Sequence, residues 1–298
     1  MAVESVAARG SVSSNVHRYG GNLRGFVRRS PFAALWGLVG LILILMAVGA
    51  PIITPNDPLK TNFTKMSAPP DSESYFGTDQ IGRDLLSRIL YGARVSLFVA
   101  LASVLLGTTI GGVWGLVSGY LGGLTDMISQ RFVEIIMALP GLILAFALVL
   151  VMGAGMWTII IAIAVTRVPF GARIIRSVAL SVKETAYVEA ARGIGASQVR
   201  IMARHVAPQC FAPFLILFTV HLGTVIVIEA SLSFLGLGVS PPTPTWGGML
   251  GEASALLYPF WWHVVFPGVF ITITVLAFNL FGDGLRDALD PRLRGTLE

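Results

Sequence analysis

The sequence predicts an all-α membrane protein with six transmembrane helices. Hydrophobic residues make up 54% of the 298 residues and charged residues only 12%, and the mean hydropathy is +0.77. The apolar residues also fall in runs of about twenty, the helix length needed to cross about 30 Å of hydrocarbon. Soluble globular domains have neither this composition nor such runs, so the membrane is the expected solvent of the chain.

Six spans are predicted in chain order. The first follows Arg28 and Arg29, and a cleavable signal peptide is disfavoured there because both the charged leader and the apolar run are long for one. The fourth is the weakest, since its apolar stretch from Met156 to Val165 is short and the arginines that follow must lie near one interface. The predicted spans cover residues of about 32–54, 94–118, 131–152, 156–178, 211–232 and 260–282.

The distribution of basic residues sets the orientation of these spans. With the N-terminus inside, sixteen of the 21 Lys and Arg residues fall in inside segments and five in outside segments. Because cytoplasmic segments carry the excess of Lys and Arg, both termini are predicted to be cytoplasmic. Deleting the fourth span would move the basic segment 173–204 outside, so the charge pattern supports a span that hydropathy alone supports weakly.

The connecting segments differ in kind. Residues 55–92 begin with a polar, Pro-rich stretch and are expected to end in an interfacial helix from Gly82, where leucines and isoleucines recur at helical spacing. Residues 179–208 are too long for a simple turn, and residues 233–259 form a Pro- and Gly-rich outside loop. In the second span, glycines at four-residue spacing from Gly107 to Gly119 predict a face for close helix packing.

The sequence shows no catalytic, metal or nucleotide site. The single Cys210 can form no internal disulfide, and no Cys/His cluster has metal-ligand spacing. The Gly-rich phosphate loop is absent, and no Ser/His or paired-Asp constellation falls within the spans. The net charge of +5 is not arranged in the basic and aromatic stripe that binds nucleic acid. We therefore expect a non-catalytic chain without a metal or cofactor of its own.

The segment 187–208 is the most informative part of the chain. Two short helices are expected, because Ala190 and Ala191 favour helix, Gly195 interrupts it and Ser197 can cap the next one. From these residues alone two interpretations stay open: a helix pair lying on lipid headgroups, or one that docks on a partner protein. An apolar stripe is expected from Ile194, Ile201, Met202 and Val206, with Pro208 marking the exit toward the fifth span.

A family resemblance favours docking. The run Glu189-Ala190-Ala191, three residues, Gly195 and then Pro208 resembles the coupling loop by which permeases of ABC importers sit in a cleft of their ATPase partners. His205 and Ala207 depart from the general pattern, although a His-x-x-Pro ending is familiar among peptide-importer permeases. The stretches 76–88, 233–248 and 282–292 resemble the C-type permease of dipeptide, oligopeptide and nickel importers, and the resemblance covers nearly everything from residue 30 onward.

The resemblance implies a type I ABC importer permease fold that forms half of a channel. Residues 1–30 would be a cytoplasmic tail and a candidate for disorder, and residues 31–298 the permease domain, with a core of about 94–282 and a coupling loop of about 183–208. The implied partners are a second homologous permease, two ATP-binding subunits that hold ATP and Mg, and an extracytoplasmic solute-binding protein, in a bacterial inner or plasma membrane. The implied coupling residues are Glu189, Ala190, Ala191, Gly195, His205 and Pro208.

Dipeptides or oligopeptides are the expected substrates, with nickel, glutathione and haem also open within the family. Glu229 and His221 are the candidate pathway or gate residues, since ionisable side chains within spans are costly unless paired or wet. Each has a structural alternative: an ion pair or a headgroup position for Glu229, and an interhelical hydrogen bond for His221. The competing function is an ion-coupled secondary transporter, which would predict inverted repeats and a carboxylate cluster that the sequence does not show.

Overall fold

The computed structural model describes residue 27, residues 30–257 and residues 260–289, and within that part the chain is helical and forms no β-strand. The long helices are α2 (Pro31–Ile53), α3 (Leu85–Leu121), α6 (Met156–Lys183), α9 (Ala207–Phe234) and α11 (Trp261–Leu289). The shorter ones are α4 (Gly123–Met137), α5 (Gly141–Met152), α7 (Ala186–Gly193), α8 (Gln198–Ile201) and α10 (Trp246–Ser254). A 3₁₀ turn at Phe63–Lys65 and a π-helical turn at Met202–Val206 complete the elements.

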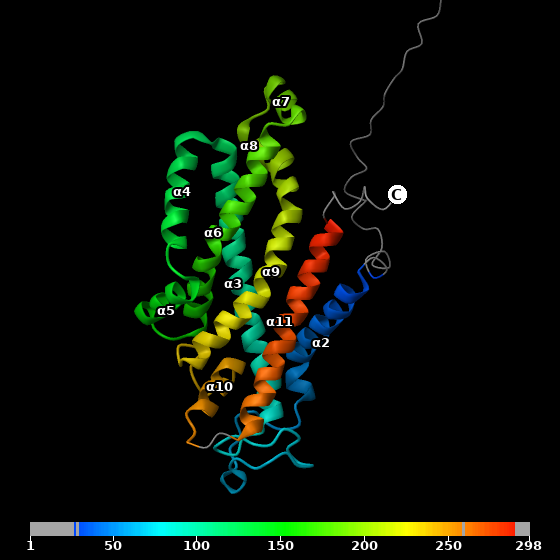
Figure 1. Cartoon of the computed structure of the whole chain (residues 1–298), viewed down its shortest axis with the longest axis vertical. Coiled ribbons are helices and arrows are strands. Elements are labelled where there is room, and N and C mark those ends of the chain that lie inside the picture. The colour runs from blue at the N-terminus through cyan, green and yellow to red at the C-terminus, as the bar shows by residue number, and fades with distance from the viewer. Residues whose placement is uncertain (1–26, 28–29, 258–259, 290–298) are drawn as a thin grey trace, which may run out of the picture.

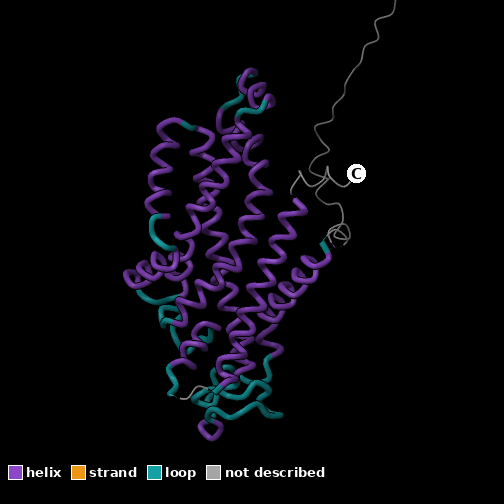
Figure 2. The backbone as a smooth tube through the Cα atoms, viewed as in Figure 1, coloured by secondary structure: helices purple, strands orange, loops and turns teal. Residues whose placement is uncertain are grey.

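The helices form an elongated bundle whose two ends differ (Figure 1). α7 projects beyond one end, which we call the α7 end. The loop between α2 and α3 lies with α10 at the opposite end, which we call the distal end, and Figure 2 shows that most of the loop structure gathers there. The N-terminal end of α2 and the C-terminal end of α11 both lie on the side of the bundle toward α7 (Figure 1).

The backbones of α3 and α6 are in close contact along a glycine seam. The seam glycines, spaced by four residues, lie against carbonyls of α6 that have the same spacing: Gly107, Gly111, Gly115 and Gly119 face Ala164, Val168, Ala172 and Arg176. A side chain at Gly111 would overlap the carbonyl oxygen of Val168. In lipid, where apolar side chains gain nothing by leaving the solvent, such close approach is the main source of helix association. The predicted packing face is confirmed.

The interfacial helix expected from Gly82 is not separate from the second span. Asp84 caps α3 by accepting a hydrogen bond from the Ser87 backbone N–H at 2.9 Å. The helix then runs unbroken for 37 residues, about 55 Å at 1.5 Å per residue. The predicted span at 94–118 therefore lies within α3, and the helix expected before it is the first part of the same helix. No proline interrupts this stretch, and Gly92 is accommodated because it packs against Trp246 of α10.

The third predicted span, 131–152, is not one helix. α4 begins earlier, at Gly123, and meets α5 at an 85° bend over residues 138–140. Pro140 lacks the N–H that would continue the helix and disfavours helical backbone at Leu139. Within the described residues, five helices are long and apolar enough to cross a membrane, and the α4–α5 pair makes a sixth if it is one broken span.

The remaining spans are present as helices. α2 and α11 contain most of the predicted runs 32–54 and 260–282, and α6 is continuous over 28 residues despite Pro169. α9 continues from α8 through the π-helical turn, and Pro208 lies in its first turn, just before the predicted fifth span at 211–232. The predicted tail, residues 1–30, falls almost entirely outside the described residues.

Candidate coupling segment and polar residues of the bundle

The segment between α6 and α9 forms two short helices that meet at Gly195, as predicted. α7 ends in a Schellman motif, in which the Ala196 N–H donates to the Ala191 carbonyl at 3.0 Å. Gly195 has φ +80°, and a Cβ placed there would meet no atom within 4 Å. Ser197 then caps α8 by accepting a hydrogen bond from the Arg200 N–H at 3.4 Å. Glycine is therefore favoured at position 195 by backbone conformation and not by crowding.

A small apolar cluster holds these helices to the bundle. Val188 and Ala191 of α7 and Ile201 of α8 are buried in a cluster with residues of α3 and α6. The Arg192 guanidinium lies 5.7 Å from the centre of the Tyr120 ring, at the α7 end of α3, a distance that suits a cation–π contact. α7 is therefore connected to both helices of the glycine seam.

The outer surface of α7 is exposed and combines charge with apolar side chains. Glu189 and Ala190 are exposed beside the buried Ala191. Ile194 and Val199 are 86% and 70% exposed at the turn, whereas Ile201 and Val206 of the predicted apolar stripe are buried. Because α7 stands beyond the end of the bundle, a partner protein can reach all of these side chains (Figure 1).

The last two residues of the predicted coupling loop lie where α9 begins. His205 is half-buried in the π-helical turn, and its ring centre is 6.2 Å from that of Tyr187 in α7. Pro208 is exposed in the first turn of α9, where proline is well tolerated. The structure thus brings His205 to α7 but leaves Pro208 apart from Glu189 and Ala190.

Glu229 is fully buried in α9. Its Oε1 accepts a hydrogen bond of 2.8 Å from Ser233 Oγ in the same helix. Its Oε2 has no partner in good hydrogen-bond geometry among the described residues, although the Ser96 hydroxyl of α3 lies close to the carboxyl. The ion pair with a neighbouring helix that the sequence left open is absent from that part of the chain. Glu229 is therefore a buried carboxyl that is only partly satisfied.

Arg167 of α6 is buried as well, with 6% of its surface exposed, whereas Arg173 of the same helix is exposed. Its Nε donates to Thr166 Oγ1 at 3.0 Å, and its guanidinium carbon lies 5.1 Å from the centre of the Phe170 ring. His221 of α9 contacts the same ring edge-on at 5.3 Å. The contact of His221 with a neighbouring helix is thus aromatic, and its Nδ1 has no hydrogen-bond partner among the described residues.

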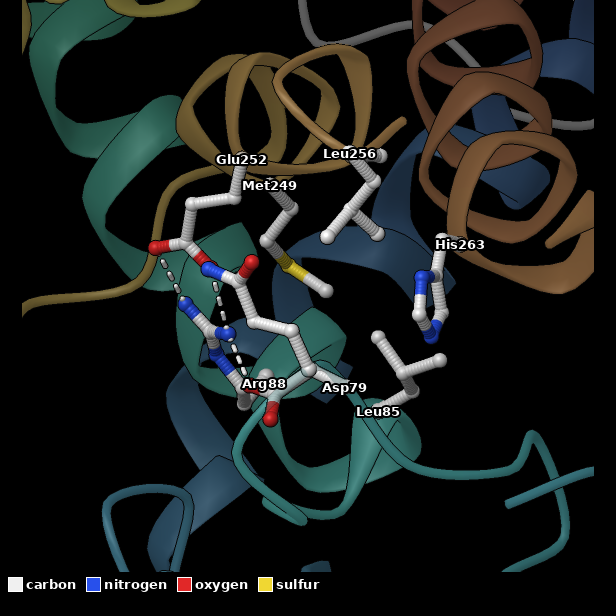
Figure 3. A pocket seen from close by; sticks show the side chains of 9 residues that line it. Asp79, Leu85, Arg88, Met249, Glu252, Leu256 and His263 are labelled. Carbon is white, nitrogen blue, oxygen red and sulfur yellow. Dashed lines mark hydrogen bonds and ion pairs between the residues drawn. The ribbon is translucent and has the colours of Figure 1, made fainter. Parts of the chain in front are cut away.

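The distal end holds a charge network that sequence reasoning missed. Arg88 of α3 donates to Asp79, in the loop before the helix, and to both oxygens of Glu252 in α10 at 2.8 and 3.0 Å (Figure 3). Arg83 donates to the same two carboxylates at 2.6 and 3.0 Å. We call these four residues the distal ion cluster. Three of them, Asp79, Arg88 and Glu252, border a cavity of about 10 Å³, the size of one water molecule.

The distal ion cluster ties the α2–α3 loop to α3 and α10. Burial alone would raise the pKa of Asp79, but the charge of Arg88, a backbone hydrogen bond from Arg83 and the charge of Arg83 together hold that pKa below its ordinary 3.8. The cluster thus brings two guanidinium groups against two carboxyl groups. The stretch 76–88 contains three of its members, but nothing in the spacing indicates that Glu252, 164 residues beyond Arg88, is the fourth.

Comparison with known proteins identifies the family. The family model for the binding-protein-dependent transport system inner membrane component matches residues 111–295. The chain belongs to this family of ABC importer permeases. Similar relatives of this permease are two proteins named glutathione transport system permease protein GsiD. The Escherichia coli O1:K1 / APEC protein is 43% identical over 272 residues, 90% of this chain and 89% of the relative. The Pectobacterium atrosepticum protein is 42% identical over 275 residues, 91% and 90% of the two chains.

Solved structures agree on the fold. An inward-facing form of the MetNI methionine ABC transporter matches this permease with a TM-score of 0.56 and 20% identity, over 68% of this chain and 96% of that chain. A second crystal form gives a TM-score of 0.53. The type I ABC importer permease fold is thus confirmed. The permease is a multi-pass inner-membrane protein and a non-catalytic subunit, and its family implies ATPase, binding-protein and second-permease partners.

Proposed function

We propose that this permease forms half of a translocation path for dipeptides or oligopeptides and that residues 183–208 couple it to two ATP-binding subunits, which hold ATP and Mg. A second homologous permease would complete the path, and an extracytoplasmic solute-binding protein would deliver the substrate. Two observations support a peptide substrate. The stretches 76–88, 233–248 and 282–292 resemble peptide-importer permeases, and relatives 42–43% identical are named for the transport of glutathione, itself a short peptide.

The position of α7 is the observation that carries the coupling proposal. α7 presents Glu189, Ala190 and Ile194 beyond the end of the bundle, while Val188 and Ala191 hold it to α3 and α6. This surface has an exposed charge (Glu189) beside a small residue (Ala190) and an apolar side chain at its tip (Ile194). It suits insertion into a cleft of a partner protein better than a position along lipid headgroups. α2 begins and α11 ends on the same side, so a cytoplasmic coupling segment agrees with the predicted cytoplasmic termini.

The coupling residues would have different roles. Glu189 and Ala190 would contact the ATPase directly, because both are exposed. Ala191 and Gly195 would set the shape of the segment, through burial and through the left-handed turn. His205 and Pro208 would transmit its position to α9, since both lie at the start of that helix.

Glu229 and His221 are proposed as pathway or gate residues. Each is buried in α9 with a polar atom that has no hydrogen-bond partner among the described residues. A polar atom left unsatisfied in a membrane-spanning helix is costly, and a second permease, water or a passing substrate would offset that cost.

Reversing the charge of Glu189 tests the coupling proposal. Glu189→Lys should lower co-purification of the ATPase subunits with the assembled permease pair by about tenfold or more, since it removes one charge-assisted contact and adds a repulsive one. Glu184→Lys is the matched control, because Glu184 is also exposed but lies at the end of α6. Equal ATPase recovery from both variants would contradict the proposal. Transport that persists without ATP and follows an ion gradient would instead support a secondary transporter.

A further inference from the structure

Arg167 is a buried cation in a membrane-spanning helix, and among the described residues no carboxylate pairs with it. Arg176 on the same helix shows the ordinary arrangement, since its Nε and Nη2 donate to the two oxygens of Asp126 at 2.5 Å each. Charged side chains within a membrane are expensive and are usually paired or placed on a substrate path. Arg167 therefore requires an anion that this part of the chain does not supply.

The guanidinium of Arg167 is also short of acceptors. An arginine side chain carries five N–H donors, and only Nε has a hydrogen-bond acceptor in the described chain, Thr166 Oγ1 at 3.0 Å. The side chain is nevertheless held in place. Its guanidinium stacks toward the Phe170 ring, and one terminal nitrogen lies 3.1 Å from the position that a Cβ of Gly141 would take. The glycine at the α4–α5 bend thus leaves the space that the guanidinium occupies.

The surroundings lead from Arg167 to the surface of the bundle. Phe170, whose ring centre lies 5.1 Å from the guanidinium carbon, is 36% exposed. His221, which touches the other part of that ring, has an Nδ1 without a partner among the described residues. One partly exposed aromatic side chain therefore contacts both the guanidinium and the imidazole.

We propose that Arg167, with Phe170 and His221 beside it, binds a carboxylate of the substrate during its passage and makes the permease favour peptides rich in carboxylates. The inference rests on the proposed import of short peptides. A guanidinium fits a carboxylate through two parallel hydrogen bonds, and in a site screened from water such a pair is strong. The imidazole adds a second polar contact to the same group.

Uptake of a peptide mixture tests the selectivity. The complete transporter with its binding protein is reconstituted in vesicles and supplied with tripeptides that carry one, two or three carboxylates. For each peptide, the uptake ratio is the uptake by Arg167→Met divided by the uptake by the wild type. Because both transporters use the same binding protein, the preference of that protein among the peptides cancels in this ratio. We expect the ratio to fall by roughly tenfold between one carboxylate and three, to fall less in Arg167→Lys, and to stay flat in Arg173→Met, an exposed arginine of α6.

If the ratio for Arg167→Met is the same for all peptides, the inference is overturned. Arg167 would then have a structural role or pair with a carboxylate of the second permease. If the wild type takes up no peptide at all, the proposed function fails instead. A cysteine variant tests the inference independently if the transporter with Arg167→Met does not assemble. Phe170→Cys in a Cys210→Ser background should react with a membrane-impermeant cationic thiol reagent and be protected by a tricarboxylate peptide. No reaction in any nucleotide state would also overturn the inference.

Discussion

Replacing Gly195 by alanine perturbs the coupling segment through one backbone torsion. An added Cβ would contact nothing within 4 Å, so the alanine clashes with no neighbour. The cost arises within the residue itself, because an L-residue held near φ +80° loses about 1–2 kcal/mol. Gly193 is the matched control, since its Cβ position is equally open but lies within α7, where alanine gains about 1 kcal/mol over glycine.

The expected result is weaker association with the ATPase subunits. If docking requires the left-handed turn at residue 195, a conformational cost of about 1–2 kcal/mol lowers the population of the docking-competent conformation. The apparent Kd for the ATPase subunits then rises by about 5–30-fold. Gly195→Asn should lie between glycine and alanine, because asparagine tolerates this conformation better. Gly193→Ala should leave the Kd within about twofold. Titration of ATPase subunits against the permease pair in lipid nanodiscs measures all four proteins, with thermal stability recorded alongside.

Equal Kd values for Gly195→Ala and Gly193→Ala would refute this reasoning, because the two changes differ only in the torsion that each position requires. A fall in the thermal stability of the whole bundle, specific to Gly195→Ala, would show that the turn supports the fold and not the docked shape.

Two further predictions concern the glycine seam and the distal ion cluster. Gly111→Ala should lower the midpoint of thermal unfolding by several degrees, because its Cβ would overlap the Val168 carbonyl and overpacking costs about 1–3 kcal/mol; Gly112→Ala, whose Cβ would lie 3.6 Å from the nearest side chain, should not. Asp79→Asn should destabilise the distal end by about 3 kcal/mol, whereas Glu73→Gln in the exposed pair with Lys65 should have little effect, and limited proteolysis of the α2–α3 loop measures both. Because folding lowers the pKa of Asp79 below 3.8, its stabilisation is lost only as the pH falls through that lowered pKa, and proteolysis should not vary between about pH 5 and about pH 8.

The sequence predicted those features that depend on local pattern. The spans followed from runs of apolar residues, the packing face of α3 from glycines four residues apart, and the two helices at Gly195 from a residue suited to the left-handed turn. Each of these signals lies within one helix or one turn. Family membership followed from several motifs in order, a pattern that needs no knowledge of contacts.

The features that were missed depend on partners distant in sequence. Hydropathy could not distinguish a surface helix joined to a span from one continuous helix, because both are apolar where α3 begins. It gave no sign of the 85° bend at Pro140, because hydropathy carries no information on the direction of the backbone. Arg83 and Arg88 were counted only among the basic residues of the outside segments, and the fold brings Asp79 and Glu252 to them. Arg167 was placed near an interface because no sequence rule indicates that Phe170 and His221 enclose it.

The positions of these contacts suggest how a movement of α7 would pass through the bundle. α3 carries the distal ion cluster near one end and the Tyr120–Arg192 contact at the other, with the glycine seam between them. Sliding α3 along α6 by one residue would drive side chains into carbonyl oxygens, so the two helices must shift together. The helical hydrogen bonding is irregular at the α4–α5 bend and at the π-helical turn before α9. The helices change direction most readily at such breaks. Arg167 lies where the seam meets that bend, against Gly107 and Gly141, so a shift of the seam relative to α5 would change the space around its guanidinium.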